Sequence, residues 1–256
     1  MFPLRDENPT DTTPFVTVFI IAVNVLVWLA VEGAGANAHL LRQAVCTYGT
    51  IPAELTGATG GFKGIQLGPG YVCQFGGLTW ATLFTSMFLH GSWLHLIGNM
   101  WFLWIFGNNI EDSMGHLRYV VFYLFTGLLA GGAHVLSATS SMIPTIGASG
   151  AISGVMGAYL LLYPRVRIHT LFFFFLFIRI FAIPAWAVLL EWLLIQVLSG
   201  ATTPAAGGGV AFWAHVGGFA AGVLLIRLFE RPEHVAARKA RGQLQHGPPP
   251  GGSWQG

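Results

Sequence analysis

Three short stretches of the sequence combine side chains that could carry out acyl-transfer chemistry. His95 and Asn99 are four residues apart, so on a helix they share one face and could aim two donors at one point. Ser149 lies within Gly-Ala-Ser-Gly, and His215 within Trp-Ala-His-Val-Gly-Gly. A hydroxyl nucleophile, a base for its proton and donors for an oxyanion are what acyl transfer requires. We therefore expect Ser149 to act as nucleophile and His215 as general base.

Glycines surround both candidate residues. Gly147 and Gly150 flank Ser149 closely, and without a Cβ they let a substrate or another helix approach the backbone. Small residues recur at 150, 153, 154 and 157, and again at 218 and 222. Stripes of this kind allow transmembrane helices to touch, which predicts that the segments containing Ser149 and His215 pack together. Because no acidic residue lies near either motif, a Ser-His dyad is favoured over a triad with an aspartate.

The composition places these residues in a membrane. Of the 256 residues, 54% are hydrophobic and only 9% are charged, with a net charge of +2, whereas an average soluble domain has roughly 25% charged residues. These values exclude an ordinary soluble enzyme, an extended disordered chain and a nucleic-acid binder with a basic face. The chain is expected to be a polytopic membrane protein.

Six segments are long and apolar enough to be read as membrane spans. They are Pro14–Val31, Trp93–Gly107, His116–Leu136, Ser149–Tyr163, Ala182–Leu198 and Val210–Phe229. We expect an all-α fold with a six-helix membrane domain over 14–229, a cytoplasmic segment over 1–13 and a disordered cytoplasmic tail over 230–256. The stretch Thr170–Phe181 is interpreted as an interfacial or tilted lead-in to the fifth span.

The distribution of Lys and Arg predicts the orientation. Only Arg42 and Lys63 fall on the side opposite the termini. The basic residues on the side of the termini, or close to it, are Arg5, Arg118, Arg165, Arg167, Arg179, Arg227, Arg231, Arg238, Lys239 and Arg241. Both termini are therefore expected in the cytoplasm and the candidate site near the outer face of a plasma or inner membrane. No cleavable signal sequence is evident, so the first span is expected to remain as an anchor.

The two cysteines lie in the long loop 32–79, which this orientation places outside. An oxidising compartment permits a Cys46–Cys73 disulfide. Two free buried thiols fit the sequence equally well. No C-x-x-C pair is present, and no metal site is expected.

Taken together, the motifs resemble the rhomboid family of intramembrane serine proteases. The matching patterns are His90-x4-His95-x3-Asn99, Gly147-Ala148-Ser149-Gly150 and Ala214-His215-x2-Gly218-x3-Gly222. The resemblance covers about Pro14–Phe229. It implies a cofactor-independent endopeptidase in which His95, Asn99 and the Ser149 N–H hold the oxyanion, with supporting roles for His90, Gly147, Gly150 and Gly218. Its substrates would be transmembrane proteins, cut in or beside a transmembrane helix and often at small residues.

One departure from that family concerns the base. Some members place a tyrosine one turn after the nucleophile to stack on the histidine, and here that position is Ser153. The orientation of His215 must then come from other packing, for which Trp213 or Phe212 is expected. The loop 200–209 is expected to cap the site.

Other polar residues are expected to have structural roles, and two other classes of protein are alternatives to the protease. His134 and Glu191 are expected to be structural, and Glu111 and Arg118 to cap helix ends. The run Phe172–Phe175 is expected to face lipid. A histidine-based metal or haem carrier would leave the serine motif unexplained. A non-catalytic chaperone that binds transmembrane helices fits the same fold. The sequence predicts no nucleic-acid partner, and it leaves the oligomeric state open.

Overall fold

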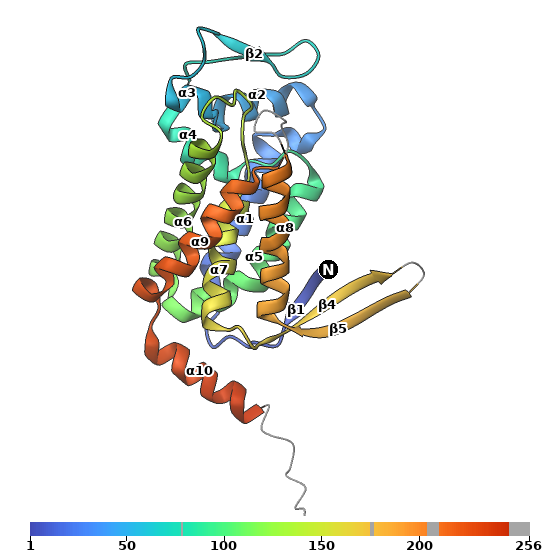
Figure 1. Cartoon of the computed structure of the whole chain (residues 1–256), viewed down its shortest axis with the longest axis vertical. Helices are drawn as coiled ribbons and strands as arrows, with labels where there is room; N and C mark the ends of the chain where they lie inside the picture. The colour runs from blue at the N-terminus through green and yellow to red at the C-terminus, as the bar shows by residue number, and fades with distance from the viewer. Residues whose placement is uncertain (78, 175–176, 204–209, 246–256) are drawn as a thin grey trace, which may run out of the picture.

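The computed structural model describes residues 1–77, 79–174, 177–203 and 210–245. Six long helices run roughly side by side and form a bundle (Figure 1). They are α1 (Phe15–Ala30), α5 (Trp93–Met114), α6 (His116–Ser137), α7 (Ser149–Leu162), α8 (Ala185–Thr202) and α9 (Phe212–Phe229). One end of the bundle carries the first long loop and is called the loop end. The other carries a small β-sheet and is called the sheet end (Figure 1).

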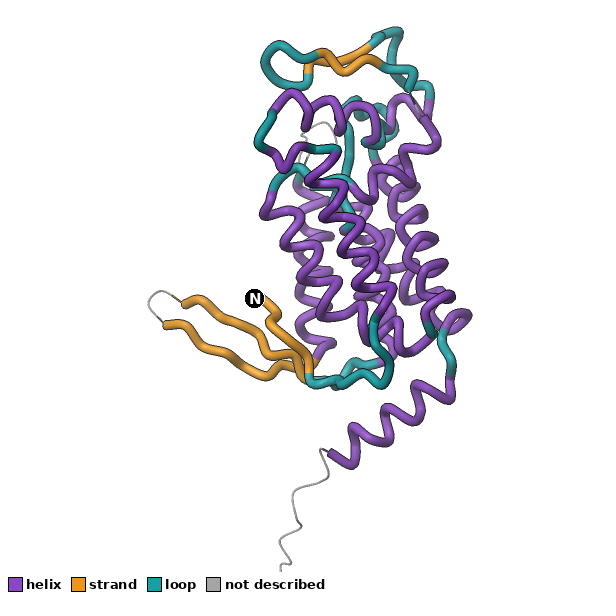
Figure 2. The backbone as a smooth tube through the Cα atoms, turned by 180° about the vertical axis from the view of Figure 1, so that it is seen from behind, coloured by secondary structure: helices purple, strands orange, loops and turns teal. Residues whose placement is uncertain are grey.

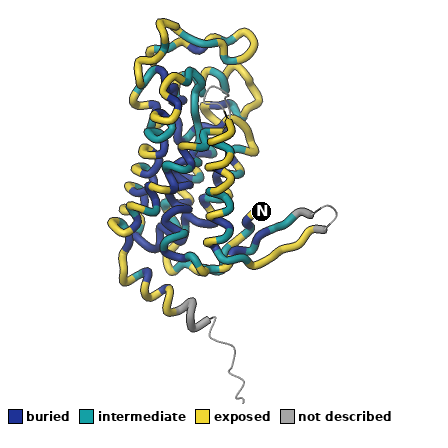
Figure 3. The backbone as a smooth tube through the Cα atoms, viewed as in Figure 1, coloured by how far each residue is buried: buried dark blue, intermediate teal, exposed yellow. Residues whose placement is uncertain are grey.

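Helix α7 lies at the centre of the bundle. Its residues from Gly150 to Tyr159 are all buried, and buried segments concentrate along the middle of the bundle (Figure 3). A Cβ at Gly218 would collide with the carbonyl oxygen of Gly150, and a Cβ at Gly222 with that of Gly154. Helices α7 and α9 therefore touch backbone to backbone, which confirms the packing expected from the small-residue stripes.

The ends of α5 follow from local sequence. The Ser92 hydroxyl accepts a hydrogen bond from the His95 N–H at 3.2 Å and caps the first turn. At the other end Gly115 adopts φ +80°, a conformation that favours glycine, and lets α6 begin at once. The Glu111 carboxylate accepts from the Val16 and Thr17 N–H groups at 2.9 and 2.8 Å, so it caps α1 as expected.

The loop end is built from short elements. They are η1 (Gly33–Gly35), α2 (Ala38–Tyr48), α3 (Pro52–Thr56), β2 (Gly64–Gln66), β3 (Val72–Gln74), η2 (Thr79–Ala81), α4 (Thr82–Thr85) and η3 (Ser86–Phe88). A disulfide joins Cys46 in α2 to Cys73 in β3, with Cα atoms 5.5 Å apart. Of the two alternatives that the sequence left open, the structure has the disulfide.

A three-stranded antiparallel sheet at the sheet end corrects the all-α expectation. Its strands β1 (Phe2–Asp6), β4 (Arg167–Phe174) and β5 (Phe177–Pro184) lie in the order β1-β4-β5. The segment Thr170–Phe181 is therefore not a lead-in to the fifth span, because its described residues belong to the paired strands β4 and β5, which extend sideways from the bundle (Figure 2). Backbone N–H and C=O groups of β4 and β5 pair with one another across the hairpin. Strand β4 also pairs with β1, beginning at Phe2 and Leu171.

The tail is also partly ordered, contrary to the expectation of a disordered segment. Helix α10 (Pro232–Gln245) follows α9. Arg238 is buried, lies 3.3 Å from the Asp112 carboxylate and donates to the Asn109 carbonyl at 3.0 Å and the Pro9 carbonyl at 3.1 Å. These contacts fix α10 against the end of α5 and the first residues of the chain. Residues 246–256 lie outside the described residues.

Length and hydropathy support a membrane location for part of this bundle. Among the described residues, α6, α8 and α9 are long and apolar enough to cross a membrane, and α1 and α7 are shorter apolar helices. Large apolar side chains are exposed on the outer surfaces of these helices, including Leu194 and Leu224 at 56% and 75%. Such a surface is suited to lipid rather than to water.

Candidate active site

Ser149 is held at the loop end by an unusual backbone conformation just before it. Gly147 adopts φ +130°, which L side chains rarely adopt, and its N–H donates to the Ser86 carbonyl at 2.9 Å. A Cβ at this position would lie 2.9 Å from His95 Nε2. The position thus requires glycine twice over, for its conformation and for the space beside His95. Helix α7 begins at Ser149 itself, so the hydroxyl lies at the positive end of the helix.

His215 meets Ser149 across the glycine contact of α7 and α9. Its Nε2 lies 2.7 Å from the Ser149 Oγ, and the residue is 8% exposed. The structure thus brings together the two residues that the sequence marked as nucleophile and base, 66 positions apart. A hydroxyl at hydrogen-bond distance from an imidazole can lose its proton to the ring as it attacks.

The remaining contacts of His215 come from α8, not from the neighbours that the sequence suggested. Its Nδ1 lies 2.7 Å from the Gln196 Oε1, and the Trp192 ring packs on the imidazole with centroids 5.7 Å apart. The expectation that Trp213 or Phe212 orients the ring is therefore wrong. Sequence reasoning missed Gln196, although it is a lone amide among apolar residues of a membrane-type helix, which is a functional signal.

The candidate oxyanion donors lie on α5. Asn99 is 7% exposed, and its Nδ2 is buried with no hydrogen-bond partner among the described residues. The His95 ring lies beside Gly147, as noted above, and its Nδ1 accepts a long hydrogen bond of 3.4 Å from the Gly91 N–H. A buried amide without a partner costs free energy, and function is one reason for a protein to retain such a group. The Asn99 Nδ2 is therefore available to a ligand.

His90 lies behind His95 rather than at the nucleophile. It is fully buried, and its ring centroid is 5.0 Å from that of His95. Its backbone N–H donates to both oxygens of Glu32, at 2.8 and 3.0 Å. Glu32 is fully buried at the end of α1, and burial raises the pKa of its carboxyl to about 7, opposed by the hydrogen bond from His90. Sequence reasoning did not identify Glu32 as a partner of His90.

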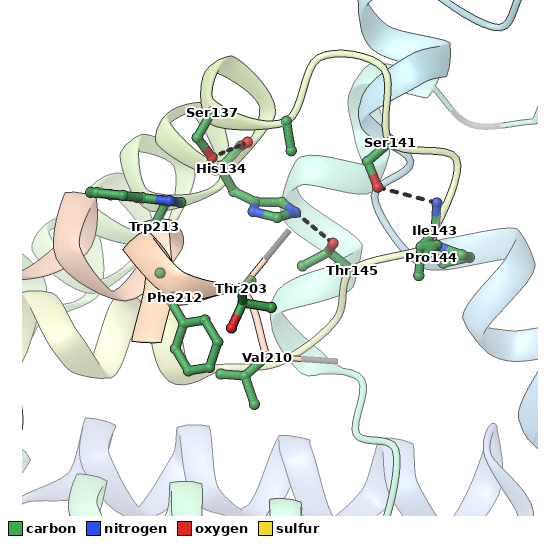
Figure 4. A pocket seen from close by; sticks show the side chains of 13 residues that line it. His134, Ser137, Ser141, Ile143, Pro144, Thr145, Thr203, Val210, Phe212 and Trp213 are labelled. Carbon is green, nitrogen blue, oxygen red and sulfur yellow. Dashed lines mark hydrogen bonds between the residues drawn. The ribbon is translucent and has the colours of Figure 1, made fainter. Parts of the chain in front are cut away.

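Two hollows adjoin the site. A cavity of about 40 Å³ has Ser149, Met87, Gly127 and Gly150 in its wall. A larger pocket of about 150 Å³ lies between the end of α6, the loop that follows it and the start of α9 (Figure 4). Both share His134, Thr145 and Ala211 in their walls, so the pocket lies next to the cavity beside Ser149.

His134 and Glu191 have polar partners other than Ser149 and His215. In Figure 4 the His134 ring points at Thr145, and its Nε2 lies 2.8 Å from the Thr145 hydroxyl. Glu191 lies on α8, 3.9 Å from the amino group of Met1. Across the described parts of the chain, no three His, Cys, Asp or Glu side chains are grouped as a metal site requires. Most of the loop 200–209 lies outside the described residues, as does Phe175.

Comparison with known proteins gives the family. A profile of the Rhomboid domain matches residues 77–232, more than half of the chain. The chain belongs to the rhomboid family. With its apolar helices, it is a multi-pass membrane protein of that family.

Several rhomboid relatives are similar over part of their length. RHOMBOID-like protein 6, mitochondrial, of Arabidopsis thaliana is 27% identical over 175 residues, which cover 61% of this chain and 54% of the relative. Rhomboid-like protein 11, chloroplastic, of the same plant is 37% identical over 76 residues, 30% of this chain and 27% of the relative. The human presenilin-associated rhomboid-like protein, mitochondrial, is 33% identical over 89 residues, 34% of this chain and 24% of the relative. This rhomboid thus matches about half, or less, of the length of these relatives.

Proposed function

We propose that this rhomboid is an intramembrane serine endopeptidase with Ser149 as nucleophile and His215 as general base. The observation that carries the proposal is the 2.7 Å separation of the Ser149 Oγ and the His215 Nε2, in which the histidine is buried and the serine partly buried. Buried polar side chains in membrane helices are costly and are a reason to expect function.

The chemistry follows from this pair. The Ser149 Oγ attacks the carbonyl carbon of a peptide bond while its proton passes to His215 Nε2. The imidazolium then gives that proton to the leaving amine, and an ester between Ser149 and the new carboxyl end remains. Water, deprotonated by the same ring, hydrolyses the ester and restores the hydroxyl. No metal or nucleotide enters these steps.

The proposed oxyanion donors are Asn99 Nδ2, a His95 ring N–H and the backbone N–H of Ser149. The missing partner of Asn99 supports this assignment, because a substrate oxygen would provide one. The start of α7 adds the positive end of a helix dipole at the same point. His90, Gly147, Gly150 and Gly218 have supporting roles in positioning these groups.

The proposed substrates are membrane proteins, cleaved within or beside a transmembrane segment. A bond in an intact helix is shielded by its own hydrogen bonds, so the segment must unwind before it reaches Ser149. The cavity of about 40 Å³ beside Ser149 supports a small side chain at the cleaved bond. The neighbouring pocket supports entry of water from the loop end.

We also propose that the chain crosses a plasma or inner membrane six times. Both termini would then lie in the cytoplasm. Strand β1 pairs with β4, and Arg238 contacts Pro9, so the segments before α1, between α7 and α8 and after α9 meet at the sheet end. This arrangement requires an even number of crossings between them, which six helices satisfy. The Lys and Arg distribution supports a cytoplasmic sheet end, and the Cys46–Cys73 disulfide supports an oxidising environment at the loop end.

The experiment is labelling of the detergent-solubilised protein with a fluorophosphonate probe, which reacts with activated serines. We expect labelling of the wild type and none of Ser149→Ala or His215→Ala. Ser140→Ala, which removes an exposed hydroxyl in the loop after α6, is the control and should label normally. Folded wild-type protein that does not label would contradict the proposal and favour a non-catalytic protein that binds transmembrane helices.

A further inference from the structure

We infer that Gln196 is a positioning residue for His215, which it holds in the tautomer that a general base needs. The inference rests on the proposed function of Ser149 and His215. It would make the site a Ser-His-Gln arrangement rather than an isolated pair, with the third residue supplied by α8.

The two hydrogen bonds of the His215 ring fix its protons. An amide oxygen only accepts, so the ring nitrogen that faces the Gln196 Oε1 at 2.7 Å must carry the hydrogen. In the neutral ring the Nε2 then has the free electron pair, and it lies 2.7 Å from the Ser149 Oγ. The serine hydroxyl is therefore the donor in that pair. The opposite tautomer would present an N–H to Ser149 and could not accept its proton.

Gln196 does not act alone in holding the ring. Trp192 precedes it by one helical turn, so both side chains leave the same face of α8. The indole lies against the imidazole with an interplanar angle of 38°, while the amide contacts its edge. Ring rotation about the Cβ–Cγ bond would break the hydrogen bond and disturb the packing. Together these side chains take the place of an aromatic residue after the nucleophile, where this chain has Ser153.

No negatively charged group performs this function at His215 in the described structure. The titratable groups that interact electrostatically with the ring from the other helices are His95 on α5 and His134 on α6. Neither can supply a carboxylate, and the contact from α8 is a neutral amide. As the proton of Ser149 arrives at Nε2, the Nδ1–H bond to Gln196 becomes charge-assisted and strengthens. The amide thus favours the imidazolium that forms during attack.

The kinetic test compares three variants by their rates of inactivation with the fluorophosphonate probe at several concentrations and pH values. Gln196→Met removes the acceptor at nearly the same size, and the maximal inactivation rate should fall about 10- to 100-fold with little change in the half-saturating concentration. Gln196→Glu keeps the acceptor and adds charge, so it should label well, with the acidic limb of the rate profile moved to higher pH. Ile195→Met changes the exposed neighbour and should behave as wild type.

A second measurement reads the tautomer without any need for activity. Nitrogen NMR of protein labelled at histidine, with His215→Asn to assign the signal, should show Nδ1 protonated and Nε2 bare near neutral pH. The signal should become a mixture of tautomers in Gln196→Met. A protonated Nε2 in the wild type, or no response to Gln196→Met in both experiments, would overturn the inference. A correct tautomer in protein that never labels would instead refute the proposed protease activity alone.

Discussion

The close approach of α7 and α9 makes a sharp prediction for Gly218→Ala. Gly218 lies one turn after His215 and opposite Gly150, the residue after Ser149. Its new Cβ would collide with the Gly150 carbonyl oxygen and lie 3.0 Å from the carbonyl carbon and 3.2 Å from the Ala130 Cβ. Backbone atoms cannot rotate aside, so the two helices must separate by about 1.5 Å to regain an ordinary spacing of ~3.5–4.0 Å.

The separation should affect stability and chemistry differently. Alanine favours a helix over glycine by about 0.5–1 kcal/mol, whereas overpacking costs about 1–3 kcal/mol, so the net loss should be about 1–2 kcal/mol. The pair of Ser149 Oγ and His215 Nε2 is 2.7 Å apart, and a shift of about 1 Å would carry it beyond hydrogen-bond distance. A misplacement of that size costs about 100-fold in rate, so labelling should suffer far more than folding.

The assay pairs thermal unfolding in detergent with the fluorophosphonate labelling rate. The matched control is Gly132→Ala, within α6, where a Cβ would meet no atom within 4 Å. The control should unfold at the same temperature or slightly higher, and it should label at the wild-type rate. If Gly218→Ala also labels at the wild-type rate, the reasoning that backbone contact of α7 and α9 sets the distance of the reacting pair is refuted.

Three other predictions concern the two ends of the bundle. Replacing Cys46 and Cys73 with serine opens a loop closed over 27 residues and should cost about 3–4 kcal/mol of stability, measured by thermal unfolding without reductant. Burial raises the pKa of Glu32 above its usual value to about 7, so the folded state is favoured while this carboxyl is protonated. Stability should therefore fall as the pH rises from about 5 through 7. Glu32→Gln should flatten that dependence when unfolding is measured across this range. Arg238→Met leaves the buried Asp112 carboxylate without its cation and should cost about 3 kcal/mol, whereas Lys239→Met, at an exposed position, should leave the unfolding temperature unchanged.

The proximity of Ser149 and His215 was the most predictable feature of the molecule. Polar side chains are so costly in apolar helices that Ser149, His215 and Asn99 stand out from the apolar sequence around them. The small-residue stripe around Gly150 and Gly218 then indicates which helices touch, because such close contact tolerates little else. Local geometry followed as well, since Glu111 and Arg118 do cap helix ends, the latter at the carbonyls of 229 and 230.

The parts that the sequence did not reveal depend on distant partners. The stretch Thr170–Phe181 is apolar except for Thr170 and Arg179, so it lacks the alternation that marks a half-buried strand, and its partner Phe2–Asp6 lies some 160 residues away. Helix α10 looked like a polar tail because only a few of its residues, among them Val235 and Arg238, are buried against the bundle. Only its amide group distinguishes Gln196 from the apolar residues around it in the sequence. The folded bundle is needed to show that His215 is its partner.

The pairing of β1 with β4 also sets an order of assembly. Phe2 cannot meet Leu171, nor Pro9 meet Arg238, until the helices between them have been synthesised and inserted. Strand β1 is thus synthesised before the helices of the bundle and is among the last elements to reach its final contacts. Meanwhile the edge of β4 would remain unpaired on that side and open to any extended segment nearby. An early defect in this strand should therefore appear as late misassembly, after the helices are already in the membrane.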